Sequence, residues 1–509
     1  MKSKVVLGID AGTSMTKVVA FDLAGNELAI SSMKTPTSTP HTAWIEEDMW
    51  EVWESVSRCI RDVASQVDGE IVAIGITATG DGTWMVDSDM NPVRPGIMWC
   101  DGRAQEVVTR WHEDGTARRS FDMCGTAPFT GTQAAQIRWL MENEPATLEN
   151  ARWIFHEKDW IFYKLTGVVS TDDSDESLTH IDLRTRRYSD DLLSLFGITQ
   201  FRDKLPPITD TRDNHAVLTA DLGLPEGVVI ASGPMDVQAH ALGVGVIEPG
   251  EGSSVLGTAG LHQVVMGDPH LGGDMVGMTL THVVQDRWLR LNAAMIATPN
   301  LDWILKVLGE QERQGFTYED LDRTLAAIPI GSRGIVYQPY IFPGGERAPF
   351  VDAAAKGGFF GLNQHHTRYD MIRAVYEGVG LSMKDCYEHM PIDVTSIRLS
   401  GGGANSPFWS QLVCDMVGTP IGIPHGSEYG AKGAAINAAV AAGLFDSYQE
   451  ATEAMISIDR RYEPNGALKQ QFDDMYGLFL ELRKAHAPLW KRRVALLETY
   501  GDGSGDIQA

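Results

Sequence analysis

The chain has 509 residues, of which 43% are hydrophobic and 22% are charged, as is typical of soluble globular proteins. This length exceeds one ordinary core, so two domains of roughly 200–250 residues each are expected. The net charge of −26 argues against nucleic acid and membrane surfaces as partners, because both require a basic protein surface. A small anionic ligand is still compatible with it, since a site can be locally positive.

The cysteines and the apolar runs indicate the compartment. The five cysteines are scattered and form no C-x-x-C pair, which favours reduced thiols and gives no support to a zinc site. The apolar run in the N-terminal stretch MKSKVVLGID is too short for a secretory signal, and no run of 18 apolar residues occurs. We therefore expect a cytoplasmic protein.

The first half of the chain predicts a β-meander followed by alternating helices and strands. Asp48 is the expected N-cap of the first helix. The expected strands are 5–9, 16–22, 27–31, 71–77 and 227–233, and the expected helices include 44–66 and 237–245.

The second half repeats this pattern in weaker form after the turn-rich stretch EPGEG at 248–252. Residues 253–266 predict a strand, a glycine turn and a second strand. Further on we expect a strand entering a glycine turn at 397–405 and helices over 406–418, 431–443 and 466–497. Two similar α/β halves follow, with a boundary near 246–250, and ligands in such proteins lie in the crevice at the carboxyl ends of the strands.

Three glycine turns follow predicted strands. In the first, Asp10 ends a strand, Gly12 allows backbone N–H groups to approach a phosphate, Thr13 and Ser14 add hydroxyl groups, and Lys17 adds a positive charge. Asp10 would face the metal ion that accompanies phosphates. An ordinary hairpin with a polar turn is the alternative.

The second turn, at Gly257 and Thr258, has the same chemistry and opens the second half. In the third, at 400–405, Gly402 and Gly403 would let a flat ring lie on the backbone, and Asn405 could hydrogen-bond a base or ribose; a tight strand–helix turn is the alternative. Neither G-x-G-x-x-G nor G-x-x-x-x-G-K-[ST] occurs, so a nucleotide site here is of neither the Rossmann nor the Walker type.

Two short segments have the composition of a site for a polyhydroxylated ligand. Gly80, Asp81 and Trp84 follow the strand at 71–77, and Asp101 and Arg103 follow a shorter strand. Aromatic faces and carboxylates are suited to holding hydroxylated ligands. A core position for Trp84, and mutual pairing of Asp101 with Arg103, are the alternatives.

A single carboxylate, Asp236, lies within the almost entirely apolar or small stretch 228–245. An unpaired buried carboxylate costs several kcal/mol. Asp236 must therefore be paired, neutralised, or held at the lip of a cleft.

The chain resembles the FGGY carbohydrate kinase family nearly from end to end. Residues 357–362 (GGFFGL) and 370–377 (DMIRAVYE) fit the family's C-terminal signature, and 345–349 (GERAP) resembles its G-E-R-x-P segment. The turn at 10–17, the turn at 257–258 and the loop at 400–405 resemble its phosphate and adenosine segments.

The resemblance implies an α/β fold of two RNase H-like domains, the actin/sugar-kinase/Hsp70 ATPase fold, with an interdomain cleft. We expect an N-terminal domain over 1–247, an ATP-binding C-terminal domain over 248–497 and a flexible tail over 498–509. It implies ATP and Mg²⁺ as cofactors, a small sugar or polyol as partner, and Asp236 as the general base; a structural helix cap is the alternative for Asp236. A homodimer is compatible with it, because dimers are common among related kinases.

Departures from the family bear on the substrate. D-xylulose kinases usually carry Met-His where this chain has Gly80 and Asp81, and Gln136 replaces the lysine of the N-terminal signature. The segments 156–167 and 182–193 look most like the erythritol kinase branch, with L-xylulose kinases next. The expected reaction is ATP-dependent phosphorylation of a terminal hydroxyl of a small polyol or ketose, with a D-xylulose or other pentulose kinase as the alternative.

A remote alternative is a non-catalytic, nucleotide-gated binding protein on the same fold. Such a protein would lack the catalytic aspartate and carry a peptide-binding domain. Asp236 is present here, and Asp10, Gly12 and Thr13 are all in place, which also argues against an inactive sugar sensor.

Overall fold

The computed structural model describes residues 2–35 and 37–500, which form a mixed α/β protein of two compact units. Unit 1 comprises Met1–Pro249, Val265–Arg290 and His425–Ser457. Unit 2 comprises Gly250–Val264, Leu291–Pro424 and Ile458–Ala509. No helix within the described residues combines the length and the apolar character needed to cross a membrane.

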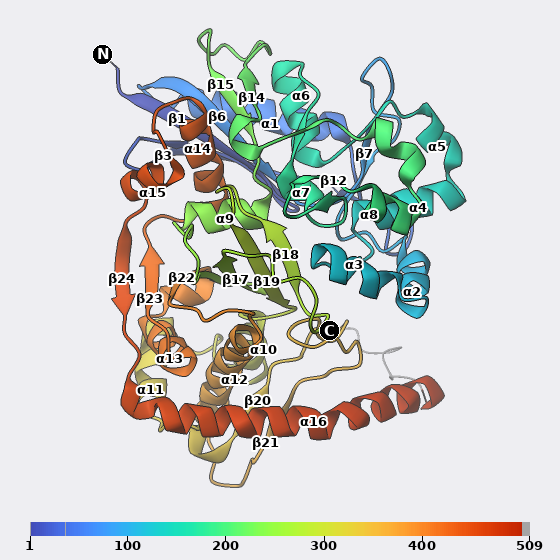
Figure 1. Ribbon diagram of the computed structural model, residues 1–509. Helices are drawn as coiled ribbons and strands as arrows, with labels where there is room; N and C mark the ends of the chain where they lie inside the picture. The colour runs from blue at the N-terminus through green and yellow to red at the C-terminus, as the bar shows by residue number, and fades with distance from the viewer. Residues whose placement is uncertain (1, 36, 501–509) are drawn as a thin grey trace. The chain divides into compact units, whose positions relative to one another are not determined.

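Unit 1 is built on a six-stranded sheet with the order β14-β15-β6-β1-β2-β3 (Figure 1). The first three strands form the predicted antiparallel meander, and β6 and β15 run parallel to β1. The carboxyl ends of β1, β6 and β15 therefore meet at one edge of the sheet. The strands are β1 (Lys4–Ala11), β2 (Met15–Phe21), β3 (Glu27–Lys34), β6 (Glu70–Ala78), β14 (His215–Val217) and β15 (Val229–Ser232).

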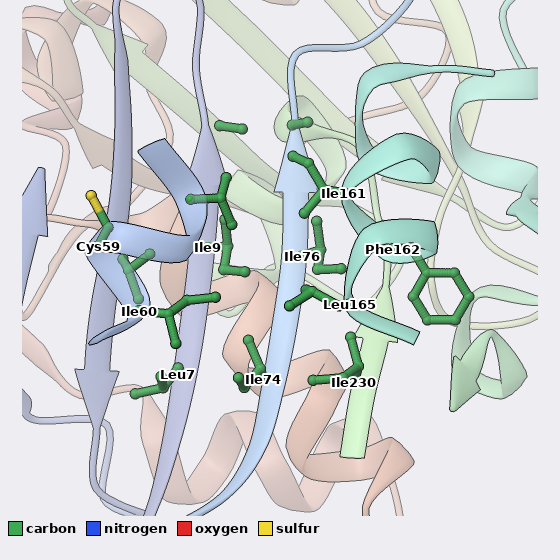
Figure 2. Packing of buried hydrophobic residues seen from close by; sticks show 14 of the residues in the cluster. Leu7, Ile9, Cys59, Ile60, Ile74, Ile76, Ile161, Phe162, Leu165 and Ile230 are labelled. Carbon is green, nitrogen blue, oxygen red and sulfur yellow. The ribbon is translucent and has the colours of Figure 1, made fainter. Parts of the chain in front are cut away.

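Helices cover both faces of this sheet, because alternate strand residues point to opposite sides. On one face, α1 (Met49–Ala64) and α6 (Glu157–Thr166) bury an apolar cluster. Figure 2 shows side chains of this cluster from both helices and from β1, β6 and β15: Leu7, Ile9, Ile60, Ile74, Ile76, Ile161, Leu165 and Ile230.

The other face of the sheet is covered by α9 (Asp236–Gly243) and α14 (Tyr429–Ala441). Glycine allows backbones to approach closely here: a Cβ at Gly8 would lie 1.9 Å from the Ala431 carbonyl oxygen. A Cβ at Gly75 would lie equally close to the carbonyl oxygen of Ala434, at 1.9 Å. Helix α14 is therefore part of unit 1, although it lies far along the chain from β1.

The rest of unit 1 consists of short elements, several of which enclose a second apolar cluster. They are β4 (Thr37–Ser38), β5 (Glu46–Glu47), β7 (Trp84–Val86), β8 (Gly96–Ile97), α2 (Gln105–Glu113), α3 (Thr116–Cys124), α4 (Gln133–Asn143), α5 (Pro145–Asn150), β9 (Trp153–Phe155), β10 (Thr171–Asp172), α7 (Asp173–Glu176), β11 (Ile181–Asp182), β12 (Arg187–Tyr188), α8 (Asp190–Phe196), η1 (Thr199–Lys204), β13 (Ile208–Thr209), η2 (Thr211–Asp213), β18 (Met278–Thr281) and α15 (Tyr448–Met455).

Unit 2 repeats the strand–turn–strand arrangement that opens unit 1. Strands β16 (Glu251–Leu256) and β17 (Gly260–Met266) are antiparallel, and β22 (Ser396–Ser400) and β23 (Ile421–Pro424) continue the sheet in parallel from β16. The remaining elements, beginning with the boundary strand β19, are β19 (Trp288–Ala294), α10 (Pro299–Val307), α11 (Tyr318–Ala326), η3 (Ser332–Gly334), β20 (Val336–Gln338), β21 (Gly358–Phe360), α12 (Arg368–Glu388), η4 (Gly402–Asn405), α13 (Pro407–Val417), β24 (Ile458–Tyr462), η5 (Gly466–Leu468) and α16 (Lys469–Tyr500).

The compact units divide the chain differently from the domains expected from the sequence. The expected boundary at 247/248 lies close to the first break at Pro249, but residues 265–290 and 425–457 also belong to unit 1. Helix α16 continues to Tyr500, so residues 498–500 of the expected tail are helical, and 501–509 lie outside the described residues.

Candidate active site

The turn between β1 and β2 presents polar groups at the carboxyl edge of the unit 1 sheet. Asp10 is the penultimate residue of β1 and lies opposite Lys17 of β2. The turn is closed by the Gly12 N–H, which donates to the Met15 carbonyl over 3.0 Å. Thr13 is partly exposed and Ser14 is exposed. The structure thus brings five of the predicted phosphate-turn residues together in one short hairpin.

The beginning of α14 lies against this turn. Lys17 Nζ lies 2.8 Å from an Oε of Glu428, the residue that precedes the helix. A Cβ at Gly430 would lie 2.5 Å from Asp10 Oδ2, so the glycine leaves room for the carboxylate in its present position. Burial raises the pKa of Asp10 to about 6, with Lys17 lowering it and Glu428 raising it. Sequence reasoning missed Glu428 and Gly430, because nothing local in the sequence connects α14 to β1.

Three successive residues after β6 each hold a different carboxylate. The Thr79 hydroxyl donates to Glu157 Oε2 over 2.5 Å. The Gly80 N–H donates to the Asp236 carboxylate. The Asp81 N–H donates to Asp175 Oδ1 over 3.1 Å. This turn, residues 79–81, therefore gathers acidic groups from α6, α7 and α9 at the edge of the sheet.

Gly80 leaves room in this turn for the Met235 side chain. A Cβ at Gly80 would lie 1.9 Å from the Met235 Sδ atom, which is impossible without a shift. Met235 immediately precedes α9. The missing side chain therefore lets the start of α9, and with it Asp236, lie directly against the turn.

Asp236 is the first residue of α9 and is partly buried. Its Oδ1 accepts a hydrogen bond from the Val237 N–H over 2.7 Å. The pKa of Asp236 is raised to about 7, chiefly by burial and then by the charges of Asp10 and Asp175, against the lowering effect of hydrogen bonds from Val237 and Gly80. A carboxylate that titrates near neutral pH has the proton affinity that a general base needs. The position at the helix start is compatible with both alternatives weighed from the sequence.

Asp81 is buried and strained. It has a φ of 62°, in the left-handed region, and its side chain accepts from the Gln133 N–H over 3.2 Å. Burial raises its pKa well above the ordinary value, with His156 lowering it and Asp175 raising it. Left-handed conformations at non-glycine residues recur at active sites, and aspartate adopts this conformation more readily than most residues.

A buried charged cluster that the sequence did not predict surrounds Asp81. Lys158 Nζ lies 3.1 Å from Asp159 Oδ1, 3.4 Å from Asp172 Oδ1 and 3.1 Å from Asp175 Oδ2. His156 lies 3.6 Å from Glu176; burial lowers its pKa, but Asp175 and Glu176 raise it to about 10. The signal in the sequence was the density of charge in HEKD and TDDSDE beside apolar segments.

Three other predicted substrate-binding residues have protein partners that account for their burial. Trp84 is 2% exposed within the apolar cluster under α1. Arg103 donates through Nε to Asp101 Oδ1 and through a terminal nitrogen to Asp101 Oδ2, each over 2.8 Å, and both side chains are fully buried. The geometry favours the alternatives given for these residues, a core position for Trp84 and mutual pairing of Asp101 with Arg103. The sequence could not decide this, because a position after a strand does not fix which way a side chain points.

Trp99, which directly precedes this segment, contacts the first turn. Its indole Nε1–H donates to the Thr13 hydroxyl over 2.9 Å. Unlike Trp84, it therefore lies beside the phosphate-turn residues, and it was not among the predicted site residues.

In unit 2, the Gly257 turn is anchored to the start of α10. The Gly257 carbonyl accepts from the Thr298 N–H and from its hydroxyl, each over 2.8 Å. The Thr258 carbonyl accepts from the Ala297 N–H over 2.9 Å, and the Thr258 side chain is exposed. The turn is thus held by its carbonyl groups, and the Thr258 hydroxyl faces solvent.

A cavity of about 850 Å³ in unit 2 is lined by the predicted residues Gly402, Gly403 and Asn405. This volume suits a cofactor-sized ligand. A Cβ at Gly402 would meet nothing within 4 Å, so the glycine keeps the cavity wall flat. Other lining residues, which the sequence did not single out, are Thr298, Leu301, Asp302, Tyr318, Asp322, Arg323, Tyr376, Ser406, Phe408 and Trp409.

Two models of one protein family match most of the chain. The model described as the FGGY family of carbohydrate kinases, N-terminal domain, matches residues 5–243, and the corresponding C-terminal domain model matches residues 252–442. The matches leave out only the chain ends and a short connection.

Characterised relatives and solved structures agree with this. The chain is 33% identical to an erythritol kinase of Brucella abortus, over 96% of this chain and 98% of that enzyme. It is 27% identical to an L-xylulose/3-keto-L-gulonate kinase of Escherichia coli, over 94% and 96%. Its fold matches a ligand-bound xylulose kinase of Lactobacillus acidophilus with a TM-score of 0.88 and 25% identity, covering 96% of this chain and 99% of that one.

Proposed function

Since the chain belongs to the FGGY family of carbohydrate kinases, and is itself a carbohydrate kinase, we propose that it transfers the γ-phosphoryl group of ATP to a terminal hydroxyl of a small polyol. Erythritol is the best candidate, and an L-xylulose-type ketose is next. The expected fold is supported by the solved structures, whose chains are matched almost completely.

The observation that carries this proposal is the position of Asp236. Its carboxylate is held by the N–H groups of Gly80 and Val237 at the edge of the sheet where β1 presents Asp10. In the proposed reaction Asp236 accepts the proton of the attacking hydroxyl as the new O–P bond forms. The bond from the γ-phosphorus to the bridging oxygen breaks at the same time, and ADP leaves. Phosphoryl transfer needs mainly this positioning and charge stabilisation from a protein.

We assign phosphate binding to the turn at residues 12–17 of unit 1 and, separately, to the Gly257 turn of unit 2, and we assign adenosine binding to the unit 2 cavity. A helix N-terminus and backbone N–H groups in a glycine turn both favour anions. The cavity at Gly402, Gly403 and Asn405 has the size for a nucleoside. Thr298 supports this assignment, because it both lines the cavity and holds Gly257.

The residues around Asp10 fit a phosphate-bound Mg²⁺ ion. Among the described residues no group of three or more His, Cys, Asp or Glu side chains is arranged to hold a metal ion. Mg²⁺ in kinases is commonly held by one or two carboxylates together with phosphate oxygens and water, and Asp10 can supply one. When bound, the ion would neutralise phosphate charge.

The choice of erythritol rests on similarity and on Asp81. The erythritol kinase of Brucella abortus is the relative with 33% identity, compared with 27% for the L-xylulose/3-keto-L-gulonate kinase. Asp81 places a buried carboxylate beside Gly80, where it can accept a hydrogen bond from a hydroxyl group. A D-xylulose or other pentulose kinase is the alternative, since a xylulose kinase of Staphylococcus epidermidis is 28% identical over 95% of this chain.

A coupled assay of ADP release over tetritols, pentitols, ketopentoses and glycerol tests the proposal. We expect the highest kcat/KM with a tetritol. If a ketopentose is preferred, the kinase reaction stands and the erythritol assignment is wrong. If no acceptor raises ADP release above the rate without acceptor, the proposed function is wrong.

A further inference from the structure

Glu47 is a buried acid that the proposed mechanism does not use. It ends the two-residue strand β5 and is 1% exposed. Neither of its carboxylate oxygens has a hydrogen-bond partner among the described residues. Burial raises its pKa to about 8. A buried polar group without a partner is costly, so a fold rarely keeps one that does nothing.

A second buried acid, Glu157, lies beside Glu47. Glu157 begins α6 and is also 1% exposed. The indole of Trp160, one turn along α6, donates to the Met49 carbonyl over 2.8 Å, and Met49 follows Glu47 by two residues. This bond fixes the start of α6 against the end of β5. In agreement, burial and then the charge of Glu47 are the main causes that raise the pKa of Glu157.

The two acids lie next to the catalytic base assigned above. Glu157 is held by Thr79 and Asp236 by Gly80, two consecutive residues of the turn at 79–81. The charges of Asp236 and Asp10 both raise the pKa of Glu157 as well. The pair Glu47–Glu157 is therefore at the same edge of the unit 1 sheet as the acceptor hydroxyl in the proposed reaction.

We propose that Glu47 and Glu157 form a subsite that binds hydroxyl groups of the acceptor. The inference rests on the proposed function, because it concerns the acceptor of that reaction. Where two buried carboxyl groups interact, one of them keeps its proton more readily, and the pair then offers oxygen atoms that accept and an O–H that donates. A hydroxyl group also both donates and accepts, and it satisfies oxygens that otherwise have no partner.

The alternative is that the two acids share a proton only to support the fold. The isosteric variant Glu47→Gln separates the two explanations, with Glu51→Gln as the matched control, because Glu51 is an exposed acid four residues further along the same segment. We expect Glu47→Gln to raise KM for erythritol by about 10-fold or more, which is the usual effect of losing a hydrogen bond to a charged group. KM for ATP should change by less than about 2-fold. Glu51→Gln should change neither constant.

A cycle with deoxy analogues makes the test specific. Erythritol analogues that each lack one hydroxyl are compared in wild type and in Glu47→Gln. If Glu47 binds a hydroxyl, the analogue without that hydroxyl loses about 10-fold in kcat/KM with wild type but little with the variant. If every analogue loses the same factor with both proteins, the subsite is wrong, even though the kinase activity of the wild type stands. If the wild type shows no acceptor-dependent ADP release at all, the proposed function itself is wrong.

The melting temperature of Glu47→Gln provides a second test. Because the pKa of Glu47 is raised to about 8 in the folded protein, ionisation opposes folding as pH rises from the ordinary value of about 4.5 towards 8. Glu47→Gln should therefore melt higher than wild type at pH 8, by roughly 2–4 °C or more, and the gap should close towards pH 5. A variant that melts lower than wild type at both pH values would show a supporting role in the fold and overturn the proposal. When Glu157→Gln is compared with wild type on the same deoxy analogues, its loss in kcat/KM should depend on the same hydroxyl group.

Discussion

The charge of Asp10, at the first glycine turn, raises the pKa of Asp236, at the start of α9. Burial is the largest cause that raises the pKa of Asp10 to about 6 and that of Asp236 to about 7. Around neutral pH, a loss of charge at Asp10 therefore makes it easier for Asp236 to ionise.

The first prediction concerns the pH profile. Asp236 must be ionised to accept a proton, so kcat/KM for the acceptor should rise as pH increases through about 7 and level off above it. Asp10→Asn removes a charge that raises this pKa, so its residual activity should show the rise at lower pH. A profile that is flat between about pH 5.5 and 8 would contradict the assignment of Asp236.

The second prediction concerns Asp81. Asp81→Asn keeps the shape of the side chain but replaces a hydrogen-bond acceptor, so we expect KM for the acceptor to rise by about 10-fold while KM for ATP stays within about 2-fold. Both constants come from initial rates with the other substrate saturating. An unchanged acceptor KM would remove Asp81 from the acceptor site.

The third prediction concerns the unit 2 cavity. Because a Cβ at Gly402 meets nothing within 4 Å, Gly402→Val should fold normally and fill part of the space assigned to adenosine. We expect KM for ATP to rise by about 10-fold or more, with acceptor KM unchanged. Gly477→Val in α16, where a Cβ also meets nothing within 4 Å, is the matched control and should leave both constants unchanged. Equal ATP constants in the two variants would exclude the cavity as the nucleoside site.

Local sequence patterns predicted the elements well. The alternation and turn residues predicted β1, β2 and β3, and Asp48 caps α1 by accepting from the N–H groups of Trp50 and Glu51, which confirms the predicted N-cap. The membership of α14 in unit 1 could not be predicted, because the close contact of Gly8 with Ala431 joins segments that are far apart in the chain.

For the candidate site, position at the end of a strand was a useful but incomplete guide. It correctly grouped Asp10 with the turn at 12–17, and it indicated Gly80 and Asp81, which contact the elements carrying Asp236 and Asp175. Position at the end of a strand does not fix the direction of a side chain. The buried pair Asp101–Arg103 therefore had the same sequence pattern as residues of an exposed binding site.

Sequence reasoning missed Glu47 and Glu157 because both look like ordinary exposed charges. Both stand among charged neighbours, in IEED and HEKD, where a solvated helix start is the ordinary interpretation. Only tertiary packing buries them to 1% exposure.

The most direct test of the account is the turnover of Asp236→Ala with saturating erythritol and ATP. If Asp236 is the base, kcat should fall by at least ~10²-fold while the binding of ATP and of erythritol, measured by calorimetry, stays close to that of wild type. A variant that turns over at nearly the wild-type rate would contradict the account.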